Sequence, residues 1–269
     1  MRIKEFFYLL GFKPNYQFYG HEIGVIELDS TKIEFANWLA PKSEKLKIQQ
    51  NEVDELRQFL SEGDLAIDVG AHIGDSTLPI ALACGKAGAV IAFEPNPLTF
   101  ALLAANSALN PQRTNIIPFP FAATASDCLL EFDYGDPWLS NGGDHAGVSK
   151  WLHGSAFSIP INGKNISALL REKFAERLSK LRYIKIDVEG SDFNVVKTLS
   201  DEIEEFRPFI KLEIGRPTSK ADRDGIASFF KRYNYELRLV LARKTLFGPL
   251  LEHDHLYGEK TIDIFAIPK

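Results

Sequence analysis

The chain has 269 residues, of which 45% are hydrophobic and 25% charged, a composition typical of a globular protein with a full hydrophobic core. Its 31 Lys and Arg and 36 Asp and Glu give a formal net charge of −5, which argues against a nucleic acid as the main partner. The two cysteines, Cys84 and Cys128, predict neither a disulfide framework nor a metal site and are expected to be reduced, packed thiols. Because no stretch approaches the roughly 18 apolar residues of a membrane span, we expect a cytoplasmic protein.

The predicted elements alternate between short β-branched runs and helical patterns, which is typical of βαβ units around a parallel sheet. Seven segments are predicted as strands: 65–69, 89–93, 115–119, 183–188, 208–214, 237–241 and 262–267. Helices are expected at 51–60, 76–84, 97–110 and 220–233, and around the apolar positions 193, 195, 196 and 199. This order predicts an α/β, Rossmann-like fold with a mostly parallel seven-stranded sheet and helices on both faces.

The first fifty residues precede this alternation. Residues 1–50, with a strand expected at 31–36, are predicted to form an N-terminal accessory segment or lid. Residues 51–269 are then expected to be one ligand-binding domain.

Regularity lapses between residues 122 and 165, where turn residues separate extended pieces such as 128–132 and 156–161. Long loops over a rigid scaffold commonly carry specificity, so we expect residues 134–158 to form one wall of a substrate pocket. Trp138 and Trp151 in this stretch are candidates either for stacking on a sugar or planar ligand or for anchoring the loop.

The first predicted strand leads into the turn Asp68-Val69-Gly70-Ala71-His72-Ile73-Gly74. Glycine lets the backbone approach a ligand closely, and the start of the next helix presents free N–H groups. The nicotinamide fingerprint requires G-x-G-x-x-G, whereas this turn follows D-x-G-x-G-x-G, the pattern of S-adenosylmethionine sites, with His72 in place of the middle glycine. A positive φ is therefore predicted at His72, because histidine tolerates it better than most residues. Taken alone, the glycine pair is equally compatible with a plain strand-to-helix turn.

Glu94 ends the second predicted strand, twenty residues after Gly74. An acidic side chain at this place can accept hydrogen bonds from both hydroxyl groups of a ribose. The alternatives are a solvated carboxylate or a contribution to the cap of the next helix, where Asn96 is the expected N-cap and Pro97 the first helical residue. The glycine turn upstream favours the ribose role.

The fourth predicted strand carries Lys185-Ile186-Asp187-Val188-Glu189-Gly190 at its carboxyl end. Open α/β sheets bind their ligands at this edge, so Asp187 is expected where the substrate and the reactive group meet. In the alternative interpretation, Lys185 and Asp187 pair with Lys211 and Glu213 of the neighbouring strand, because charges buried in a sheet need partners. Both interpretations can hold together.

These motifs resemble those of the FkbM family of S-adenosylmethionine-dependent methyltransferases, whose members read I-D-V-G-A-N-x-G-x-x-T, F-E-P-N-P and K-I-D-V-E-G-x-E. The corresponding segments are 67–77, 93–97 and 185–192, and the resemblance extends from about residue 65 to 267. It implies a class I methyltransferase fold with S-adenosylmethionine as the cofactor. The residues it implies in cofactor binding are Asp68, Gly70, Ala71, His72, Ile73, Gly74, Ser76, Thr77, Glu94, Pro95, Asn96 and Asp187. The chain departs from the family at His72 (usually asparagine), Asp192 (usually glutamate) and Ser167 (usually aspartate).

The resemblance further implies O-methylation of a hydroxyl group on a sugar, glycan or small natural product. Asp187 is the best candidate for orienting or deprotonating that hydroxyl, with Glu189 as the second choice. No metal is expected, although a divalent ion held with Glu213 stays open. We expect a small-molecule or glycan acceptor, no nucleic-acid partner and no membrane span, and a homo-oligomer is compatible with the sequence.

Two other functions fit the same fold. An NAD(P)-dependent oxidoreductase would share Glu94, but it should carry a three-glycine turn and a catalytic lysine–tyrosine pair or histidine, which the sequence lacks. A non-catalytic binding protein on a degenerate methyltransferase fold is the other alternative. The intact Asp68, Gly70, Gly74, Glu94 and Asp187 weigh against it.

Overall fold

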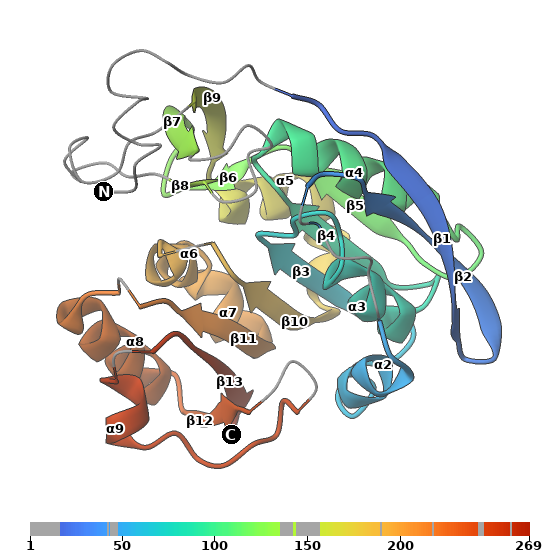
Figure 1. Ribbon diagram of the computed structural model, residues 1–269. Coiled ribbons are helices and arrows are strands. Elements are labelled where there is room, and N and C mark those ends of the chain that lie inside the picture. The colour runs from blue at the N-terminus through green and yellow to red at the C-terminus, as the bar shows by residue number, and fades with distance from the viewer. Residues whose placement is uncertain are drawn as a thin grey trace.

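The computed structural model describes residues 17–41, 43, 48–134, 142–143, 157–188, 190–216, 218–241, 245–258 and 260–269. Within these ranges a central sheet has seven strands in the spatial order β12-β13-β11-β10-β3-β4-β5 (Figure 1). Their bounds are β3 Leu65–Val69, β4 Ala89–Phe93, β5 Ile116–Phe119, β10 Leu181–Ile186, β11 Phe209–Ile214, β12 Tyr235–Val240 and β13 Ile262–Pro268. The five strands from β5 to β11 pair in parallel, whereas β13 runs antiparallel to both of its neighbours. The mostly parallel seven-stranded sheet predicted from the sequence is confirmed.

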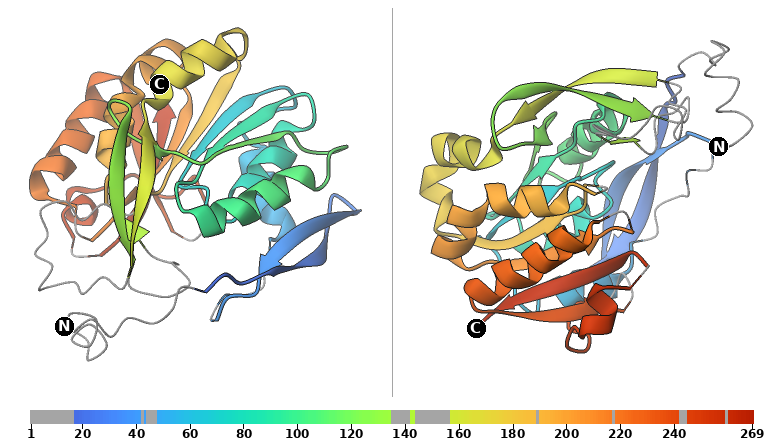
Figure 2. Two further views of the ribbon diagram at one scale, coloured as in Figure 1. Left: turned by 90° about the horizontal axis from the view of Figure 1, so that it is seen from above. Right: turned by 90° about the vertical axis from the view of Figure 1, so that its left-hand side faces the viewer.

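Helices cover both faces of this sheet, as predicted (Figure 2). Their bounds are α2 Gln50–Leu56, α3 Thr77–Cys84, α4 Pro97–Ala108, α5 Ile166–Leu178, α6 Asp192–Thr198, α7 Ser200–Phe206, α8 Lys220–Arg232 and α9 His253–Leu256. Alternate strand residues supply the two layers of the core: Ile67 packs with residues of α5 to α8, and Ala66 with residues of α3 and α4. Among the described residues, no helix combines the length and the apolar character needed to cross a membrane.

The region from 122 to 164 contributes a second, four-stranded sheet in the order β6-β9-β7-β8. Its strands are β6 Ala122–Ala123, β7 Cys128–Tyr134, β8 Gly142–Gly143 and β9 Phe157–Lys164. The two extended pieces expected from the sequence are therefore the paired strands β7 and β9.

Several expectations need correction. The sequence reading missed α5, although Asn165 caps its start by accepting a hydrogen bond from the Ala168 N–H at 3.0 Å. The predicted helix 51–60 ends at Leu56. Cys84 is packed as expected, but Cys128 is exposed because it begins the short sheet and not a core strand.

An N-terminal hairpin of β1 (His21–Leu28) and β2 (Thr31–Trp38) lies against α4, at the right of Figure 1. Asp29 and Ser30 form its two-residue turn with φ of 51° and 54°, the geometry that matches the twist of a tight hairpin. Its inner residues pack into a cluster with side chains of α3 and α4. The division into an accessory segment 1–50 and a domain 51–269 stays a proposal.

Candidate functional site

The turn after β3 contains three residues with positive φ, Gly70, His72 and Gly74. Gly70 has φ 81°, and a Cβ placed on it would lie 1.8 Å from the carbonyl oxygen of Asp187. His72 has φ 50°, which confirms the conformation predicted for it. The N–H groups of Gly70 and Ala71 both donate to the carbonyl of Phe93, at 2.9 and 3.0 Å. The turn therefore lies pressed between the ends of β4 and β10, where only glycine fits at position 70.

Asp68 supports this turn from below. Its side chain is fully buried, and Oδ2 accepts hydrogen bonds from Ser76 Oγ at 2.9 Å and Thr77 Oγ1 at 2.7 Å. Its Oδ1 lies 3.3 Å from Lys185 Nζ. Asp68 and Thr77 thus fix the position of the turn but do not line the cavity beside it. Ala71 and Gly74 do not line that cavity either.

Asn106 of α4 also fixes the turn, and the sequence reading missed it. Its Nδ2 donates to the carbonyl of Ile73 at 2.8 Å, while its Oδ1 accepts from the N–H of Ala36 in β2 at 2.7 Å. One buried amide therefore connects the glycine turn to the N-terminal hairpin. Position 106 lies on a helix predicted from the sequence, but no pattern indicated these partners.

Glu94 is buried at the end of β4, and both of its carboxylate oxygens contact the protein. Its Oε2 accepts from the His72 N–H at 2.8 Å, and Oε1 accepts from the Asn96 N–H at 2.9 Å and from Thr99 Oγ1 at 3.0 Å. Burial raises the pKa of Glu94 above its ordinary value, and the His72 imidazole and these hydrogen bonds oppose that shift. Glu94 therefore organises the start of α4, and Oε2 keeps acceptor capacity toward the cavity that it lines.

Asn96 and Pro97 occupy the places predicted for them. Asn96 is the N-cap of α4 and accepts a hydrogen bond from the Leu98 N–H at 2.9 Å, and Pro97 is the first helical residue.

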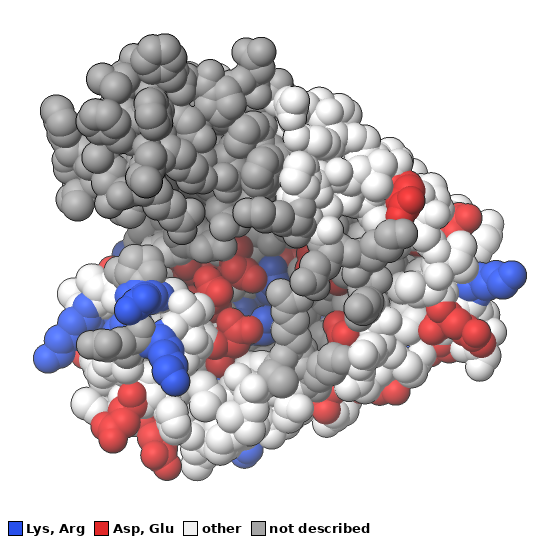
Figure 3. All heavy atoms as spheres, in the orientation of Figure 1, with Lys and Arg blue, Asp and Glu red and all other residues white. Residues whose placement is uncertain are grey.

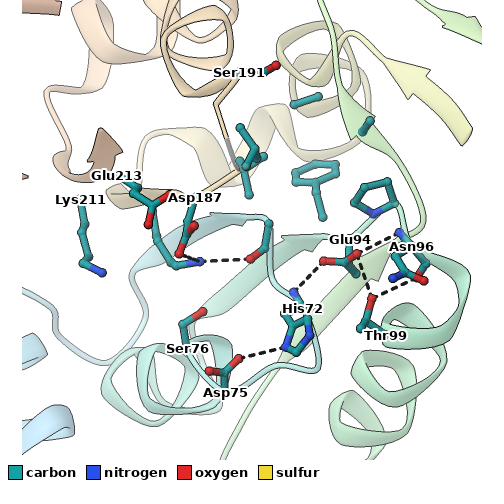
Figure 4. A pocket seen from close by; sticks show the side chains of 18 of the residues that line it. His72, Asp75, Ser76, Glu94, Asn96, Thr99, Asp187, Ser191, Lys211 and Glu213 are labelled. Carbon is teal, nitrogen blue, oxygen red and sulfur yellow. Dashed lines mark hydrogen bonds and ion pairs between the residues drawn. The ribbon is translucent and has the colours of Figure 1, made fainter. Parts of the chain in front are cut away.

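Asp187 follows β10 and lies beside the glycine turn (Figure 4). Its N–H donates to the carbonyl of Val69 at 3.0 Å, and its side chain is 36% exposed, with Oδ2 3.5 Å from Lys185 Nζ. Lys185 also donates to the carbonyl of Gly70 at 3.1 Å. Burial alone would lower the pKa of Lys185, but the carboxylates of Asp68 and Asp187 outweigh it and raise that pKa. Lys185 is thus a fixed cation that joins the turn to Asp187.

Asp192 holds the segment that follows Asp187. Its two carboxylate oxygens accept from the N–H groups of Val188 at 2.8 Å and Gly190 at 2.9 Å. Burial raises its pKa, and the two backbone hydrogen bonds oppose that shift. The aspartate that stands where the resembled family has glutamate is therefore a clamp on this loop. Glu189, the second catalytic candidate, lies outside the described residues.

The charges of the neighbouring strands do not pair as the alternative interpretation expected. Lys185 lies beside Lys211 in the register of β10 and β11, so the two ammonium groups turn to other partners. Lys185 binds Asp68 and Asp187, whereas Lys211 lies 2.7 Å from Asp263 of β13. Figure 4 shows Lys211 and Glu213 on the side of Asp187 away from Glu94.

A single open cavity of about 1590 Å³ brings these groups together at the carboxyl edge of the sheet. The predicted residues that line it are Gly70, His72, Ile73, Ser76, Glu94, Pro95, Asn96 and Asp187. Figure 3 shows acidic side chains with basic ones among them in the hollow of this face. Further lining residues come from the stretch around β6 and β7, which includes Phe121, Phe132 and Tyr134.

The wall predicted for residues 134–158 falls mostly outside the described residues, as do Trp138 and Trp151. Tyr134 of that stretch lines the cavity. Among the described residues, no group of three or more His, Cys, Asp or Glu side chains is arranged to hold a metal ion.

Comparison with known proteins places these features in a family. Residues 68–237 match the family described as methyltransferase FkbM domain. A curated relative, the hexuronic acid methyltransferase AglP of Haloferax volcanii, is 28% identical over 169 residues, which are 63% of this chain and 63% of that protein. The match thus spans less than two thirds of that relative's length.

Solved structures similar to this chain include a methyltransferase FkbM of Methylobacillus flagellatus KT, with 16% identity, a TM-score of 0.47, and coverage of 77% of this chain and 44% of that one. A precorrin-6y C5,15-methyltransferase of Geobacter metallireducens GS-15 has 12% identity and a TM-score of 0.44, with coverage of 85% of this chain and 94% of that one.

Proposed function

The chain belongs to the FkbM family of S-adenosylmethionine-dependent methyltransferases, and on this premise we propose that it methylates a hydroxyl group of a sugar. One observation carries the proposal: the glycine turn, Glu94 and Asp187 lie around one cavity, which therefore has a place for a nucleoside and a place for an acceptor. The named activity of AglP on a hexuronic acid supports a sugar as the class of acceptor. The nicotinamide alternative is set aside, because the family uses a different cofactor.

The residues at the turn fit S-adenosylmethionine. At Gly70 a Cβ would meet the Asp187 carbonyl, so the turn can stay close to β10 and leave the cavity open beside it. Glu94 Oε2 is the acceptor for the ribose hydroxyls, and Gly70, His72, Ile73, Ser76, Pro95 and Asn96 line the remaining contact surface. Asp68 and Thr77 hold the turn through side-chain hydrogen bonds, and Ala71 and Gly74 hold it through backbone hydrogen bonds. The bound cofactor supplies a methyl group on a positively charged sulfur.

We assign Asp187 to the acceptor hydroxyl. Transfer of a methyl group requires in-line attack by oxygen, so alignment is the enzyme's main task, and a carboxylate at the hydroxyl can take its proton as the new bond forms. Asp187 is partly exposed to the cavity and is held by Lys185 on one side and by its own backbone bond to Val69 on the other. Glu189 stays the second choice, and the mechanism needs no metal.

The charges at the acceptor end favour a neutral or amino sugar over a uronate. On the strand ends at this side, the described residues that line the cavity include three carboxylates (Asp187, Glu213 and Asp263) and two ammonium groups (Lys185 and Lys211). With Asp68 behind the cavity, these described residues carry a formal excess of two negative charges. Each ammonium group already has a carboxylate partner. A further carboxylate on the substrate would meet repulsion at this end of the cavity.

Methyl transfer from labelled S-adenosylmethionine into a panel of neutral hexoses, amino sugars, hexuronates and phenolic natural products tests the function. We expect incorporation into a neutral or amino sugar at a higher kcat/KM than into any hexuronate. Transfer to phenols alone would contradict sugar specificity, and a preference for hexuronate would contradict the charge argument. A thermal-shift comparison of S-adenosylhomocysteine with NAD is the control, and stabilisation is expected from the former alone. Absence of any cofactor binding would support the non-catalytic alternative.

A further inference from the structure

The two edges of the N-terminal hairpin differ in whether their outward-facing backbone groups are hydrogen-bonded. On the outer edge of β2, the N–H and carbonyl of Glu34 bond to the side chain of Asn110, and those of Ala36 bond to the side chain of Asn106. The side chains of two asparagines in the α4 region therefore make the hydrogen bonds that a neighbouring strand would make. The outer edge of β1 has no such cover among the described residues.

The tight turn determines which residues of β1 face this uncovered edge. In an antiparallel pair joined by a two-residue turn, the flanking residues Leu28 and Thr31 form a hydrogen-bonded pair, and such pairs then recur at every second residue. The backbone N–H and carbonyl groups of the intervening residues point away from β2. These residues are His21, Ile23, Val25 and Glu27. The same alternation directs the groups of Glu34 and Ala36 toward the asparagines of α4, as observed.

The uncovered edge is also apolar in its middle. The side chains of Ile23 and Val25 are 48% and 57% exposed. A long edge strand with exposed apolar residues is a template for pairing with another strand, and proteins usually protect such edges with charges, proline or a bulge. Here the edge is eight residues long, with ionisable side chains near its ends and not in its middle.

We propose that β1 pairs antiparallel with β1 of a second copy of this chain, with the two-fold axis beside Gly24. In this register His21 lies opposite Glu27 of the partner subunit, and Ile23 lies opposite Val25 of the partner subunit. Every outward-facing backbone group of the strand then has a partner, whereas a shift by two residues leaves some of them unpaired. The result is a continuous four-stranded sheet across the dimer with a self-complementary interface.

The second copy is favoured over an unrelated strand because the edge complements itself. The same two-fold rotation that brings the apolar residues together places an imidazole opposite a carboxylate at both ends. An unrelated partner would need this pattern by coincidence.

The proline variant Val25→Pro tests the pairing. The Val25 N–H points outward, so proline removes a donor from the edge and leaves the β1–β2 hydrogen bonds intact. We expect the wild-type chain to sediment at twice its mass of 30.2 kDa and Val25→Pro to sediment at the single mass. The matched control Val25→Thr keeps both the branched shape and the N–H and should remain dimeric. A wild-type protein that is monomeric at all concentrations, or a dimeric Val25→Pro, would overturn the proposal.

A charge exchange tests the register even where the proline variant fails to fold. His21→Glu places two carboxylates opposite each other and should weaken the dimer several-fold. Adding Glu27→Lys to the same chain restores opposite charges and should recover the wild-type dissociation constant. Failure of the second change to rescue the first would show that these residues do not face each other, and the register would be wrong. Thermal unfolding of each variant separates loss of the dimer from loss of the fold.

Discussion

The two halves of the cavity, which we assign to the cofactor and to the acceptor, are built on different principles. In the cofactor half, at the ends of β3 and β4, backbone groups and buried side chains do the positioning: Gly70 and Ala71 bond to Phe93, and Glu94 accepts three hydrogen bonds. In the acceptor half, at the ends of β10 and β11 and beside β13, charged side chains position each other: Lys185 lies between two carboxylates and Lys211 beside a third. The first half is fixed by backbone conformation and tolerates few residues, whereas the second can change its specificity by exchanging charges.

The largest effect is expected from Gly70→Ala, because it acts on the backbone of the cofactor half. The added Cβ would lie 1.8 Å from the Asp187 carbonyl, and alanine is strained at φ 81°. The turn must move, so we expect loss of S-adenosylhomocysteine binding by calorimetry or failure to fold.

Gly63→Ala is the matched control for that variant. Its φ of 96° is also positive, but no heavy atom lies within 4 Å of the added Cβ. The strain it introduces should lower the free energy of unfolding by about 1 kcal/mol, and the variant should bind the cofactor normally. If the two variants behaved alike, the close approach of the turn to β10 would not explain the glycine.

Asp187→Asn addresses the acceptor half. The amide keeps the shape of the side chain but cannot take a proton, so kcat should fall about a hundredfold or more, with S-adenosylhomocysteine affinity little changed. Asp75→Asn is the control, because Asp75 is another carboxylate that lines the cavity, and it should keep near-normal turnover. Normal turnover in Asp187→Asn, or activity that chelation abolishes and Mg²⁺ restores, would reject a metal-free carboxylate mechanism.

Glu94→Ala should act on affinity and not on the chemical step. Loss of a charge-assisted hydrogen bond to the ribose typically costs about 1.5–3 kcal/mol, so the dissociation constant for S-adenosylhomocysteine should rise by about one to two orders of magnitude. Thr99→Val removes one hydrogen bond to Glu94 but keeps the carboxylate, and it should leave this affinity nearly unchanged. Equal losses in the two variants would mean that Glu94 acts only as a support for α4.

The same contrast explains what the sequence could predict. The positive φ at His72 and the N-cap at Asn96 follow from local backbone rules, and both conformations were predictable. The pairing of Lys185 was not, because it depends on strand register: Lys185 lies level with Asp68 on one side and with Lys211 on the other. A like charge at one neighbour turns the lysine toward the other, and no one-dimensional pattern reveals which strands are adjacent.

Asn106 was missed for a related reason. Its amide bonds to residues 33 and 70 positions away in the chain, so its role depends on how the hairpin packs on α4. Helix α5 was a different kind of omission. Its local signal, the cap at Asn165 followed by buried Ile166, Leu169 and Leu170, was present in the sequence but lay at the end of an irregular stretch.

The smallest effect we expect is a pH dependence confined to the cofactor half. Burial raises the pKa of Glu94 above its ordinary value of 4.5. In the apoprotein, the contribution of Glu94 to the free energy of unfolding is therefore fully present below pH 4.5 and is lost as the pH rises through the raised pKa. Cofactor affinity moves the opposite way, because ribose hydroxyls donate to the carboxylate. Affinity for S-adenosylhomocysteine should therefore decline already at pH values above 4.5 as the solution is acidified, and calorimetry over a pH series measures this.

His72 provides the sharpest control, because its imidazole opposes the rise in the pKa of Glu94 while its backbone N–H bonds to the carboxylate. His72→Asn keeps the N–H and a residue type that tolerates positive φ, but it removes the ionisable ring. The pKa of Glu94 should then rise further, and the loss of affinity should begin at a higher pH than in the wild type. If His72→Asn left the pH profile of S-adenosylhomocysteine affinity unchanged, and Glu94→Gln still showed this pH dependence, the titrating group would be neither Glu94 nor His72.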